Sequence, residues 1–512
     1  MSTLVGQLGN IARQHPAHIA LSDASGDLSY AALWEASQRL ASHLQQRGCR
    51  QGDRIALILP NRNEAVIANY AAWLLGAVFV PLNAQARQRD FAVWLQHAQA
   101  RFLIHESGQA DIDAAVAELS QPPQRIVLAA RNASTPVPAS ADWQTAMQQP
   151  CWSGILPDGD ALAAILYTSG TTGAPKGVML SHANFVANVD AIVSYLELQA
   201  SDSIATILPF YYSYGASVLH THLRVGARVL IEQNLVFPHL LIETLARERI
   251  SGFSGVPSTY SLLLDRVALE DYDLSALRYL TQAGGPMTPA LTKRLRAALP
   301  QARLFVMYGQ TEATARLACL SPELLEQKLG SVGLPIAGVE IAIRDSDDQP
   351  LPAGVTGQVC ARGANVMQGY WHDAEASAAT LKDGWLHTGD LGHLDDDGFL
   401  HLLGRRSDMI KTGAHRVHPL DVEEVIAEYE GVREVAVIGI DDAVLGQAIK
   451  AIVVPCAGVS LNPRSIQAHC RQRLAMYKIP KLVEFIDQLP RTASGKLRRA
   501  ELARSHAPQE PS

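Results

Sequence analysis

The stretch Ile165-Leu-Tyr-Thr-Ser-Gly-Thr-Thr-Gly-Ala-Pro-Lys-Gly177 runs from an apolar segment into a loop of hydroxyl residues, glycines and one lysine. Glycines let a backbone approach a ligand closely, hydroxyl and N–H groups donate hydrogen bonds to anionic oxygens, and a lysine adds positive charge. We therefore expect a strand followed by a polyphosphate-binding loop. A Walker A motif is excluded, because Pro175 precedes Lys176 and Gly177 follows it. The alternative, a Gly/Ser/Thr linker, does not normally follow a buried strand directly.

Strand and helix patterns alternate on both sides of this stretch. From Tyr30 to about Glu106, and again from Ala161 to about Gly309, short apolar runs are separated by helical patterns. This rhythm is typical of parallel sheets covered by helices. We expect two related α/β lobes, with the strand at Ala163–Tyr167 in the second lobe.

The composition changes after Gly330. Short alternating runs, separated by turns rich in Pro, Gly and Asp, continue to about Leu403 and predict an antiparallel, barrel-like or meandering sheet. A small α+β unit follows. The predicted fold class is therefore α/β, with two α/β lobes, a β-barrel-like subdomain and a small C-terminal domain. The predicted division of the chain is an N-terminal domain 1–403, a hinge 404–408, a C-terminal domain 409–505 and a polar tail 506–512.

The composition narrows the function. The chain has 512 residues, and 43 basic against 50 acidic residues give a net charge of −7, which offers no basic footprint for nucleic acid. The six cysteines are widely spaced and indicate reduced thiols. No secretory signal is visible, and the most apolar segment, 65–80, is shorter than the roughly 20 residues of a membrane span. A cytoplasmic protein without a transmembrane segment is expected.

A second polar cluster, Tyr308-Gly-Gln-Thr-Glu312, follows the predicted strand Leu304–Met307. Open α/β sheets bind ligands at the carboxyl ends of their strands. An aromatic ring, a hydroxyl and a carboxylate could stack on a base, donate to a phosphate and hold Mg²⁺. A polar turn without function is the alternative, and the glycine-rich loop favours the functional interpretation.

With these motifs, nearly the whole chain resembles the adenylate-forming superfamily, which includes acyl- and aryl-CoA synthetases, adenylation domains of peptide synthetases and beetle luciferases. In type it is most similar to acyl-CoA ligases. The resemblance rests on five motifs in the family's order and spacing: Tyr167–Gly177, Tyr308–Glu312, His387–Asp390, Gly404–Lys411 and Pro490–Lys496. It implies a mobile C-terminal domain that closes over the ATP site.

The resemblance also implies roles for single residues. The β- and γ-phosphates of ATP would be held by Thr168, Ser169, Gly170, Thr171, Thr172, Gly173 and Lys176. The nucleoside would be held by Gly284, Gly285, Pro286, Tyr308, Gly309, Asp390 and Arg405, with Tyr308 stacked on adenine and Asp390 on the ribose hydroxyls. Thr311 would meet the α-phosphate, Glu312 the magnesium ion, and Lys496 both reacting groups. Without the motif context, Asp390 would read as a turn carboxylate and Lys496 as a solvated lysine.

The implied activity is ATP-dependent activation of a carboxylic acid as an acyl-adenylate, followed by thioester formation with CoA, as in fatty acid metabolism. Acyl-carrier-protein phosphopantetheine is the alternative acceptor, and a catalytically silent homologue or a luciferase-like oxygenase are further alternatives. Two departures bear on the thioester step: Ser407 stands where the family's hinge residue is usually Asp or Lys, and Ala414 stands where a glycine usually lines the thiol channel. The oligomeric state is not predicted.

The segment Pro209-Phe-Tyr-Tyr-Ser-Tyr-Gly215 is expected to line the acid pocket through Tyr212, Ser213 and Tyr214, together with Gly309. Core packing is an equal alternative for Phe210 and Tyr211. No Asp or Glu occurs between Pro209 and Gly226, so an uncharged acyl tail is favoured over an amino acid. Tyr212 replaces the gating histidine of many relatives. The pairs His220/His222 and His415/His418 lack further ligands nearby and are interpreted as structural.

Overall fold

The computed structural model describes residues 3–130, 141–168, 176–232, 237–413, 415–442, 445–492 and 495–505. The predicted phosphate-loop residues Ser169–Gly173 and the channel residue Ala414 lie outside these ranges. Within them, three sheets carry the fold, with fourteen, seven and five strands. No helix in the described ranges is both long enough and apolar enough to cross a membrane.

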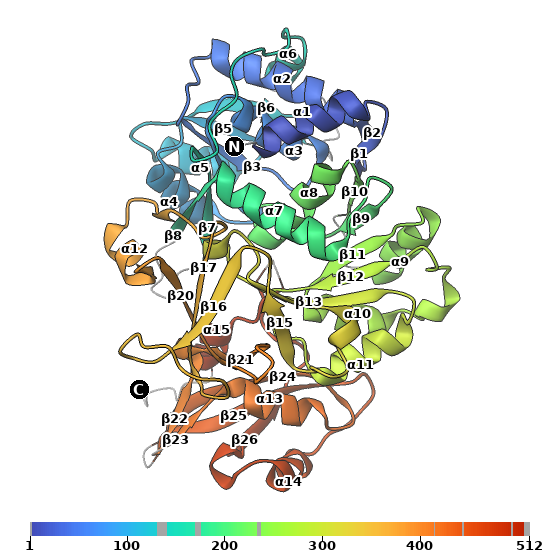
Figure 1. Ribbon diagram of the computed structural model, residues 1–512, viewed down its shortest axis with the longest axis vertical. Coiled ribbons are helices and arrows are strands. Elements are labelled where there is room, and N and C mark those ends of the chain that lie inside the picture. Colours follow the sequence, from blue (N-terminus) through green and yellow to red (C-terminus); the bar gives the residue numbers. More distant parts are fainter. Residues whose placement is uncertain are drawn as a thin grey trace.

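The seven-stranded sheet forms the first lobe, at the top of Figure 1. Its strands, in spatial order, are β18 (Gly369–Tyr370), β8 (Lys176–Ser181), β7 (Leu162–Thr168), β4 (Val78–Pro81), β3 (Arg54–Ile58), β5 (Phe102–Glu106) and β6 (Gln124–Leu128). The strands from β7 to β6 are parallel, and β8 and β18 are antiparallel. Alternate residues of β3 face opposite cores, because helices cover both faces of the sheet.

The fourteen-stranded sheet combines the second lobe with the predicted barrel-like subdomain. Its spatial order is β16 (Val339–Arg344), β17 (Gly357–Gly363), β20 (Trp385–Leu394), β21 (Leu400–Arg405), β15 (Ser331–Pro335), β14 (Ala318–Leu320), β13 (Arg303–Tyr308), β12 (Tyr279–Gln282), β11 (Gly252–Gly255), β9 (Ser203–Thr206), β10 (Arg228–Ile231), β1 (Ile19–Asp23) and β2 (Gly26–Ser29), with β19 (Leu381–Lys382) beside β20. The strands from β13 to β1 are parallel, and the others are antiparallel.

The two lobes are interleaved, which corrects one prediction. The strand expected at Ala163–Tyr167 in the second lobe is β7, and it pairs with β4 of the first lobe. Conversely, β1 near the N-terminus pairs with β10 of the second lobe. Chain order alone does not determine which sheet a strand joins, because an apolar strand of this kind can be buried in either sheet.

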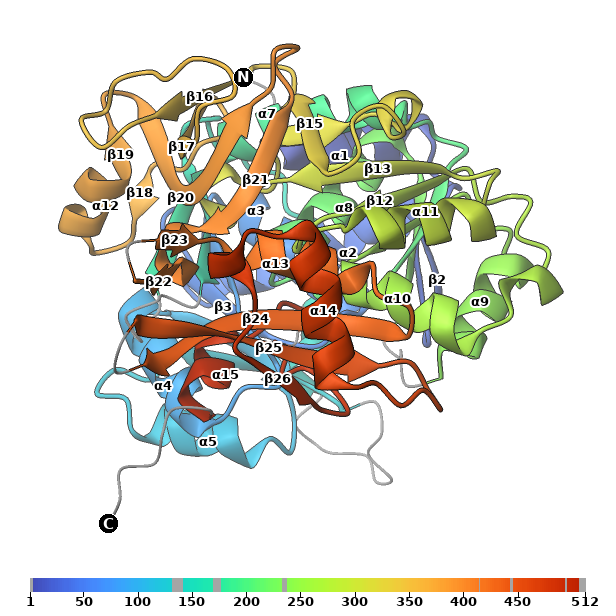
Figure 2. The same ribbon diagram turned by 90° about the horizontal axis from the view of Figure 1, so that it is seen from below.

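The five-stranded sheet forms the C-terminal lobe, drawn in orange and red at the bottom of Figure 1 and in front of the large lobe in Figure 2. Its strands are β23 (His415–Val417), β22 (Ile410–Thr412), β25 (Gly446–Pro455), β24 (Val432–Asp442) and β26 (Leu482–Phe485). The predicted fold class, a large α/β N-terminal part with a small α+β C-terminal part, is confirmed. The numbered domain boundaries and the hinge stay a prediction.

Helices cover these sheets. The α-helices are α1 (Leu4–Gln14), α2 (Tyr30–Gln46), α3 (Asn63–Leu74), α4 (Gln88–Ala98), α5 (Ala110–Ala117), α6 (Ala141–Met147), α7 (His182–Leu196), α8 (Ser213–Val225), α9 (Pro238–Arg247), α10 (Pro257–Arg266), α11 (Pro289–Ala298), α12 (Ala374–Thr380), α13 (Pro419–Ala427), α14 (Pro463–Arg473) and α15 (Arg499–Ser505). The short 3₁₀ turns that bear on the site are η3 (Thr311–Ala313) and η5 (Arg406–Asp408).

Candidate active site

Tyr308, Asp390 and Arg405 form one hydrogen-bonded group. The Tyr308 hydroxyl, at the end of β13, donates to Asp390 Oδ2 at 2.6 Å. Arg405 Nε lies 2.8 Å from Asp390 Oδ1, and the two residues are direct partners on β20 and β21. Burial raises the pKa of the Asp390 carboxyl, and Arg405 and Tyr308 oppose that rise. Three residues that the sequence placed near the nucleoside are therefore in direct contact.

Glu312 lies in η3, immediately after β13. Its Oε1 accepts a hydrogen bond from the Tyr370 hydroxyl at 2.9 Å, and its carbonyl accepts one from the Met367 N–H at 2.9 Å. The neighbouring Thr311 Oγ1 lies 3.2 Å from Ser213 Oγ at the start of α8. The predicted α-phosphate and metal residues thus sit between β13, β18 and α8.

Lys176 is brought to the same place by β8. It pairs with Thr168 across the β7–β8 ladder, and its Nζ lies 4.9 Å above the centre of the Tyr370 ring. Tyr370 therefore links the lysine predicted for the outer phosphates to Glu312. The sequence reasoning missed Tyr370, because its position depends on the pairing of β18 with β8, which joins segments far apart in the chain.

Gly284, Gly285 and Pro286 follow β12 and form a partly exposed turn. Gly285 O accepts a hydrogen bond from Gln282 Nε2 at 2.7 Å, and Gly284 has a φ of +83°, which favours glycine. A Cβ on Gly284 would lie 3.8 Å from Lys496 Cε. The predicted adenine wall therefore borders the lysine contributed by the C-terminal lobe.

Lys496 is held in a tight loop that packs on the large lobe. The Thr492 N–H donates to the Lys496 carbonyl at 2.8 Å, and the Lys496 N–H donates to Thr492 Oγ1 at 3.1 Å. A Cβ on Gly495 would lie only 2.7 Å from Val256 Cγ2, so the loop approaches α10 closely. Lys496 keeps an exposed surface, yet desolvation and Arg405 lower the pKa of its ammonium, while Glu312 and Asp390 oppose this.

The predicted hinge is tied to the C-terminal lobe through Asp408. Ser407 Oγ lies 3.1 Å from Asp408 Oδ1, and Arg499 Nε lies 3.7 Å from Asp408 Oδ2. Arg499 also donates to both carboxylate oxygens of Glu423, at 2.6 and 2.8 Å. Asp408, directly after Ser407, therefore supplies an anchored carboxylate close to the position where the family usually has a charged residue.

The residues predicted for the acid pocket differ in their surroundings. Ser213 contacts Thr311, and the rings of Tyr211 and Tyr212 lie 4.4 Å apart at the entrance to α8. Tyr214 is buried, and its hydroxyl donates to the Thr281 carbonyl at 2.8 Å. Gly309 is packed so closely that a Cβ there would lie 2.0 Å from the Ala315 carbonyl oxygen.

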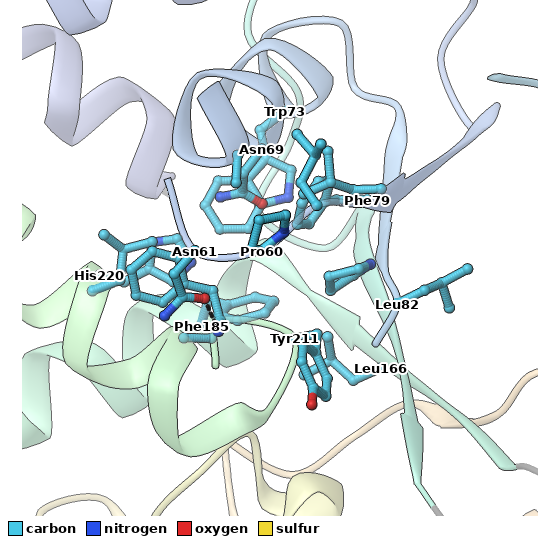
Figure 3. Close-up of a pocket in the computed structure, with 18 residues that line it drawn as sticks. Pro60, Asn61, Asn69, Trp73, Phe79, Leu82, Leu166, Phe185, Tyr211 and His220 are labelled. Carbon is cyan, nitrogen blue, oxygen red and sulfur yellow. Dashed lines mark hydrogen bonds between the residues drawn. The ribbon is translucent and has the colours of Figure 1, made fainter. Parts of the chain in front are cut away.

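A pocket lies behind Tyr211 and is here called the inner pocket. In Figure 3, Trp73 and Asn69 lie at one end of it, and Tyr211 and Leu166 lie at the other. It is lined by Leu57, Leu59, Pro60, Asn61, Ala65, Asn69, Trp73, Phe79, Pro81, Leu82, Ala164, Leu166, Phe185, Phe210, Tyr211, Ala216, Leu219 and His220. The sequence reasoning missed most of these residues, which come from both interleaved lobes.

A larger cleft of about 700 Å³, open to solvent, separates the large and C-terminal lobes. Pro60, Asn61 and Tyr211 line both this cleft and the inner pocket, and Thr492 and Gly495 beside Lys496 also line the cleft. The two hollows therefore meet at Tyr211, and the Lys496 loop borders the space in front of it.

This geometry agrees with the match to a family model. The model described as AMP-binding enzyme matches residues 9–371, and the model described as AMP-binding enzyme C-terminal domain matches residues 421–496. The chain belongs to the AMP-binding enzyme family. The predicted membership of the adenylate-forming superfamily is confirmed, and so is the prediction of an AMP-forming acid–thiol ligase.

Other members of the family resemble the whole chain. A feruloyl-CoA synthase of an Amycolatopsis species is 34% identical over 497 residues, covering 96% of this chain and 97% of its own. ATP-bound MatB from Rhodopseudomonas palustris has a TM-score of 0.89 at 28% identity, covering 98% of both chains. An o-succinylbenzoate CoA synthetase from Bacillus subtilis, solved with its acyl-adenylate, has a TM-score of 0.82 at 31% identity, covering 97% of both chains. The same enzyme has been solved with ATP and a magnesium ion.

Proposed function

We propose that this AMP-binding enzyme ligates a carboxylic acid to CoA in two steps through the residues described above. In the first step a carboxylate oxygen attacks the α-phosphorus of ATP, forms the acyl-adenylate and expels pyrophosphate. In the second step the thiol sulfur of CoA attacks the acyl carbon, the thiol loses its proton and AMP leaves. The observation that carries the proposal is the position of Lys496, which lies beside Gly284 and is electrostatically coupled to Glu312 and Asp390.

Charge explains why Lys496 must be there. A carboxylate approaching a phosphate meets repulsion of about 1 kcal/mol per charge pair at 4 Å in water, and several times more in a less polar cleft. Lys496 from the C-terminal lobe and Lys176 from β8 of the large lobe would both bring positive charge to the site. They would offset the repulsion and stabilise the charge that builds on the departing pyrophosphate.

The nucleoside would rest on the group around Asp390. Tyr308 would stack on adenine while its hydroxyl holds Asp390, whose carboxylate would accept hydrogen bonds from the ribose hydroxyls. Arg405 keeps that carboxylate paired and oriented before ATP arrives. Thr311 would donate to the α-phosphate, and Thr168, Ser169, Gly170, Thr171, Thr172, Gly173 and Lys176 would hold the outer phosphates.

Glu312 fits a magnesium ligand. Oxygen donors are what Mg²⁺ prefers, and no described residue donates a hydrogen bond to Glu312 Oε2. Tyr370 holds the other carboxylate oxygen and thereby orients the group. When bound, Mg²⁺ would neutralise part of the phosphate charge.

For the acid, we propose a site that begins at Ser213 and Gly309 and continues past Tyr212 and Tyr211 into the inner pocket. Tyr214 would support this site from the core, because its hydroxyl is already hydrogen-bonded to Thr281. Fatty or aryl acids suit the apolar lining. A cytoplasmic location is proposed on the sequence alone.

The test is acid-dependent pyrophosphate release by the purified enzyme with ATP, Mg²⁺ and a panel of fatty, aryl and hydroxy acids. CoA or an acyl carrier protein bearing phosphopantetheine is then added, and thioester is measured. We expect pyrophosphate release with at least one acid and thioester with CoA. Thioester with the carrier protein alone would identify the other acceptor, and an absence of pyrophosphate release with every acid would indicate a silent homologue.

A further inference from the structure

The inner pocket has an apolar wall and a polar inner part. None of its 18 lining residues carries a charged side chain. Among its polar groups, Asn61 is engaged with the Leu208 carbonyl and the Phe210 N–H, and Trp73 Nε1 donates to the Ala163 carbonyl. Tyr211, which also lines the cleft, is hydrogen-bonded to Tyr212. Asn69 and His220 therefore remain as the polar groups that can serve a ligand.

His220 presents a hydrogen-bond donor. Its Nδ1 lies 3.1 Å from the hydroxyl of Tyr70, which is fully buried. If Tyr70 accepted this hydrogen bond, its own proton would be buried without a partner, so the hydroxyl must donate to an unprotonated Nδ1. Burial lowers the pKa of His220 to about 3, so the ring is neutral and carries its single proton on Nε2.

Asn69 presents a second donor. Its Nδ2 is buried, and no described residue accepts a hydrogen bond from it. A buried donor without an acceptor is costly, because it has lost its contact with water. A ligand atom that accepts a hydrogen bond at this end of the pocket would remove that cost.

The inner pocket lies along α8, and α8 begins beside Thr311, the residue proposed to meet the α-phosphate. Ser213, Ala216 and His220 are three and four residues apart on α8, so they form one stripe of its surface. Ser213 contacts Thr311, while Ala216 and His220 line the inner pocket. The seven helical steps from Ser213 to His220 span about 10 Å. This is close to the length of an aryl-propenoic acid or an eight-carbon acid.

We propose that the inner pocket selects acids about 10 Å long with an uncharged tail whose far end carries a hydrogen-bond acceptor, such as a hydroxyl, ether or ketone oxygen. His220 and Asn69 would donate to that acceptor. A second carboxylate or an ammonium group would be buried without a countercharge, so dicarboxylic acids and amino acids are disfavoured. This inference rests on the proposed function and adds the substrate class.

The experiment measures kcat/KM for pyrophosphate release with matched acids: octanoic, 7-oxooctanoic and octanedioic acid, and cinnamic and 4-methoxycinnamic acid. In each matched pair we expect the acceptor-bearing monoacid to be preferred about tenfold, and octanedioic acid to be the poorest substrate. The variants His220→Phe and Asn69→Leu should each bring the ratio of kcat/KM values within a matched pair toward one. His222→Phe is the control, because His222 is buried in the same helix but hydrogen-bonds Tyr279 and does not line the pocket.

Three results would overturn the proposal while leaving the proposed function intact. One is equal use of matched acids by the unaltered enzyme, another is a preference for octanedioic acid, and the third is an unchanged preference in His220→Phe and Asn69→Leu. The ranking by the unaltered enzyme decides the matter even where a variant fails to fold. An absence of pyrophosphate release with every acid would instead refute the proposed function.

Discussion

Tyr308 and Asp390 are joined by a 2.6 Å hydrogen bond although three strands, β14, β15 and β21, separate β13 from β20 in their common sheet. Adjacent strands lie about 4.8 Å apart, so four steps across a flat sheet would place the two residues roughly 19 Å apart. The sheet must therefore curl back on itself here. This curl gives the barrel-like shape expected from the sequence, and it forms one wall of the proposed nucleotide site.

Loss of the Tyr308 hydroxyl should weaken ATP binding selectively. Tyr308→Phe keeps the ring for stacking but removes the donor to the buried Asp390 carboxylate, a type of hydrogen bond worth about 1.5–3 kcal/mol. We expect the KM for ATP to rise roughly tenfold or more with a smaller change in kcat. The measurement is ATP-dependent pyrophosphate release, with Tyr272→Phe, in a loop away from the site, as control. If Tyr308→Phe and the control had equal KM values for ATP, the hydrogen bond from Tyr308 to Asp390 would not contribute to ATP binding.

Removal of the Lys496 ammonium should affect chemistry more than binding. We expect Lys496→Ala to lower adenylate formation by roughly 10²–10³-fold, as for other single electrostatic donors, and to leave ATP affinity largely intact. ATP–pyrophosphate exchange measures the first effect and equilibrium dialysis the second. Arg498→Ala, at an exposed residue two positions further on, is the control. Unchanged exchange in Lys496→Ala would refute the proposed role.

The lowered pKa of Lys496 predicts the alkaline limit of adenylation. The role proposed for Lys496 requires its ammonium form, and desolvation together with Arg405 lowers the pKa of this group below the usual 10.5. Its positive charge is therefore lost at a lower pH than in an ordinary lysine, and the exchange rate should fall as pH rises through that lowered value. Lys496→Arg keeps its charge and should lose this alkaline limb. If the exchange rate fell at the same alkaline pH in the unaltered enzyme and in Lys496→Arg, a group other than Lys496 would be responsible for the fall.

Closure of the C-terminal lobe should be sensitive to a single methyl group at Gly495. A Cβ there would meet Val256 at 2.7 Å, whereas a Cβ on Gly458, which has a similar positive φ, would meet nothing within 4 Å. We expect Gly495→Ala to slow adenylation roughly tenfold, because such overpacking typically costs 1–3 kcal/mol. Gly458→Ala should leave the rate unchanged. If Gly495→Ala and Gly458→Ala slowed adenylation equally, strain in the positive-φ backbone would be responsible, and not the contact with Val256.

Substitution of Glu312 should change the demand for magnesium. Glu312→Gln keeps the size of the side chain and the contact with Tyr370 but removes the negative charge. We expect the Mg²⁺ concentration that gives half-maximal pyrophosphate release to rise severalfold. Glu323→Gln, an exposed carboxylate paired with Arg303, is the control. A normal Mg²⁺ dependence in Glu312→Gln would argue against this residue as a ligand.

The sequence predicted the local elements well where an apolar run was continuous, as at Leu304–Met307, which lies within β13. It also predicted Tyr308, Asp390 and Lys496 as members of one site, because each lies in a motif of the family. It could not predict Tyr370 or the lining of the inner pocket, since these positions depend on pairing between distant segments. The assignment of β7 to the second lobe was wrong for the same reason.

The pairing of Leu21 on β1 with Val229 on β10 constrains the order in which the chain can assemble. On the ribosome, β1 must wait for more than two hundred further residues before its partner has been synthesised, and loop closure over such a distance is slow. The edge of the fourteen-stranded sheet that contains β1 therefore cannot form until β10 has been made. Truncations that end before β10 should leave the β10-facing edge of β1 unpaired and should aggregate during synthesis.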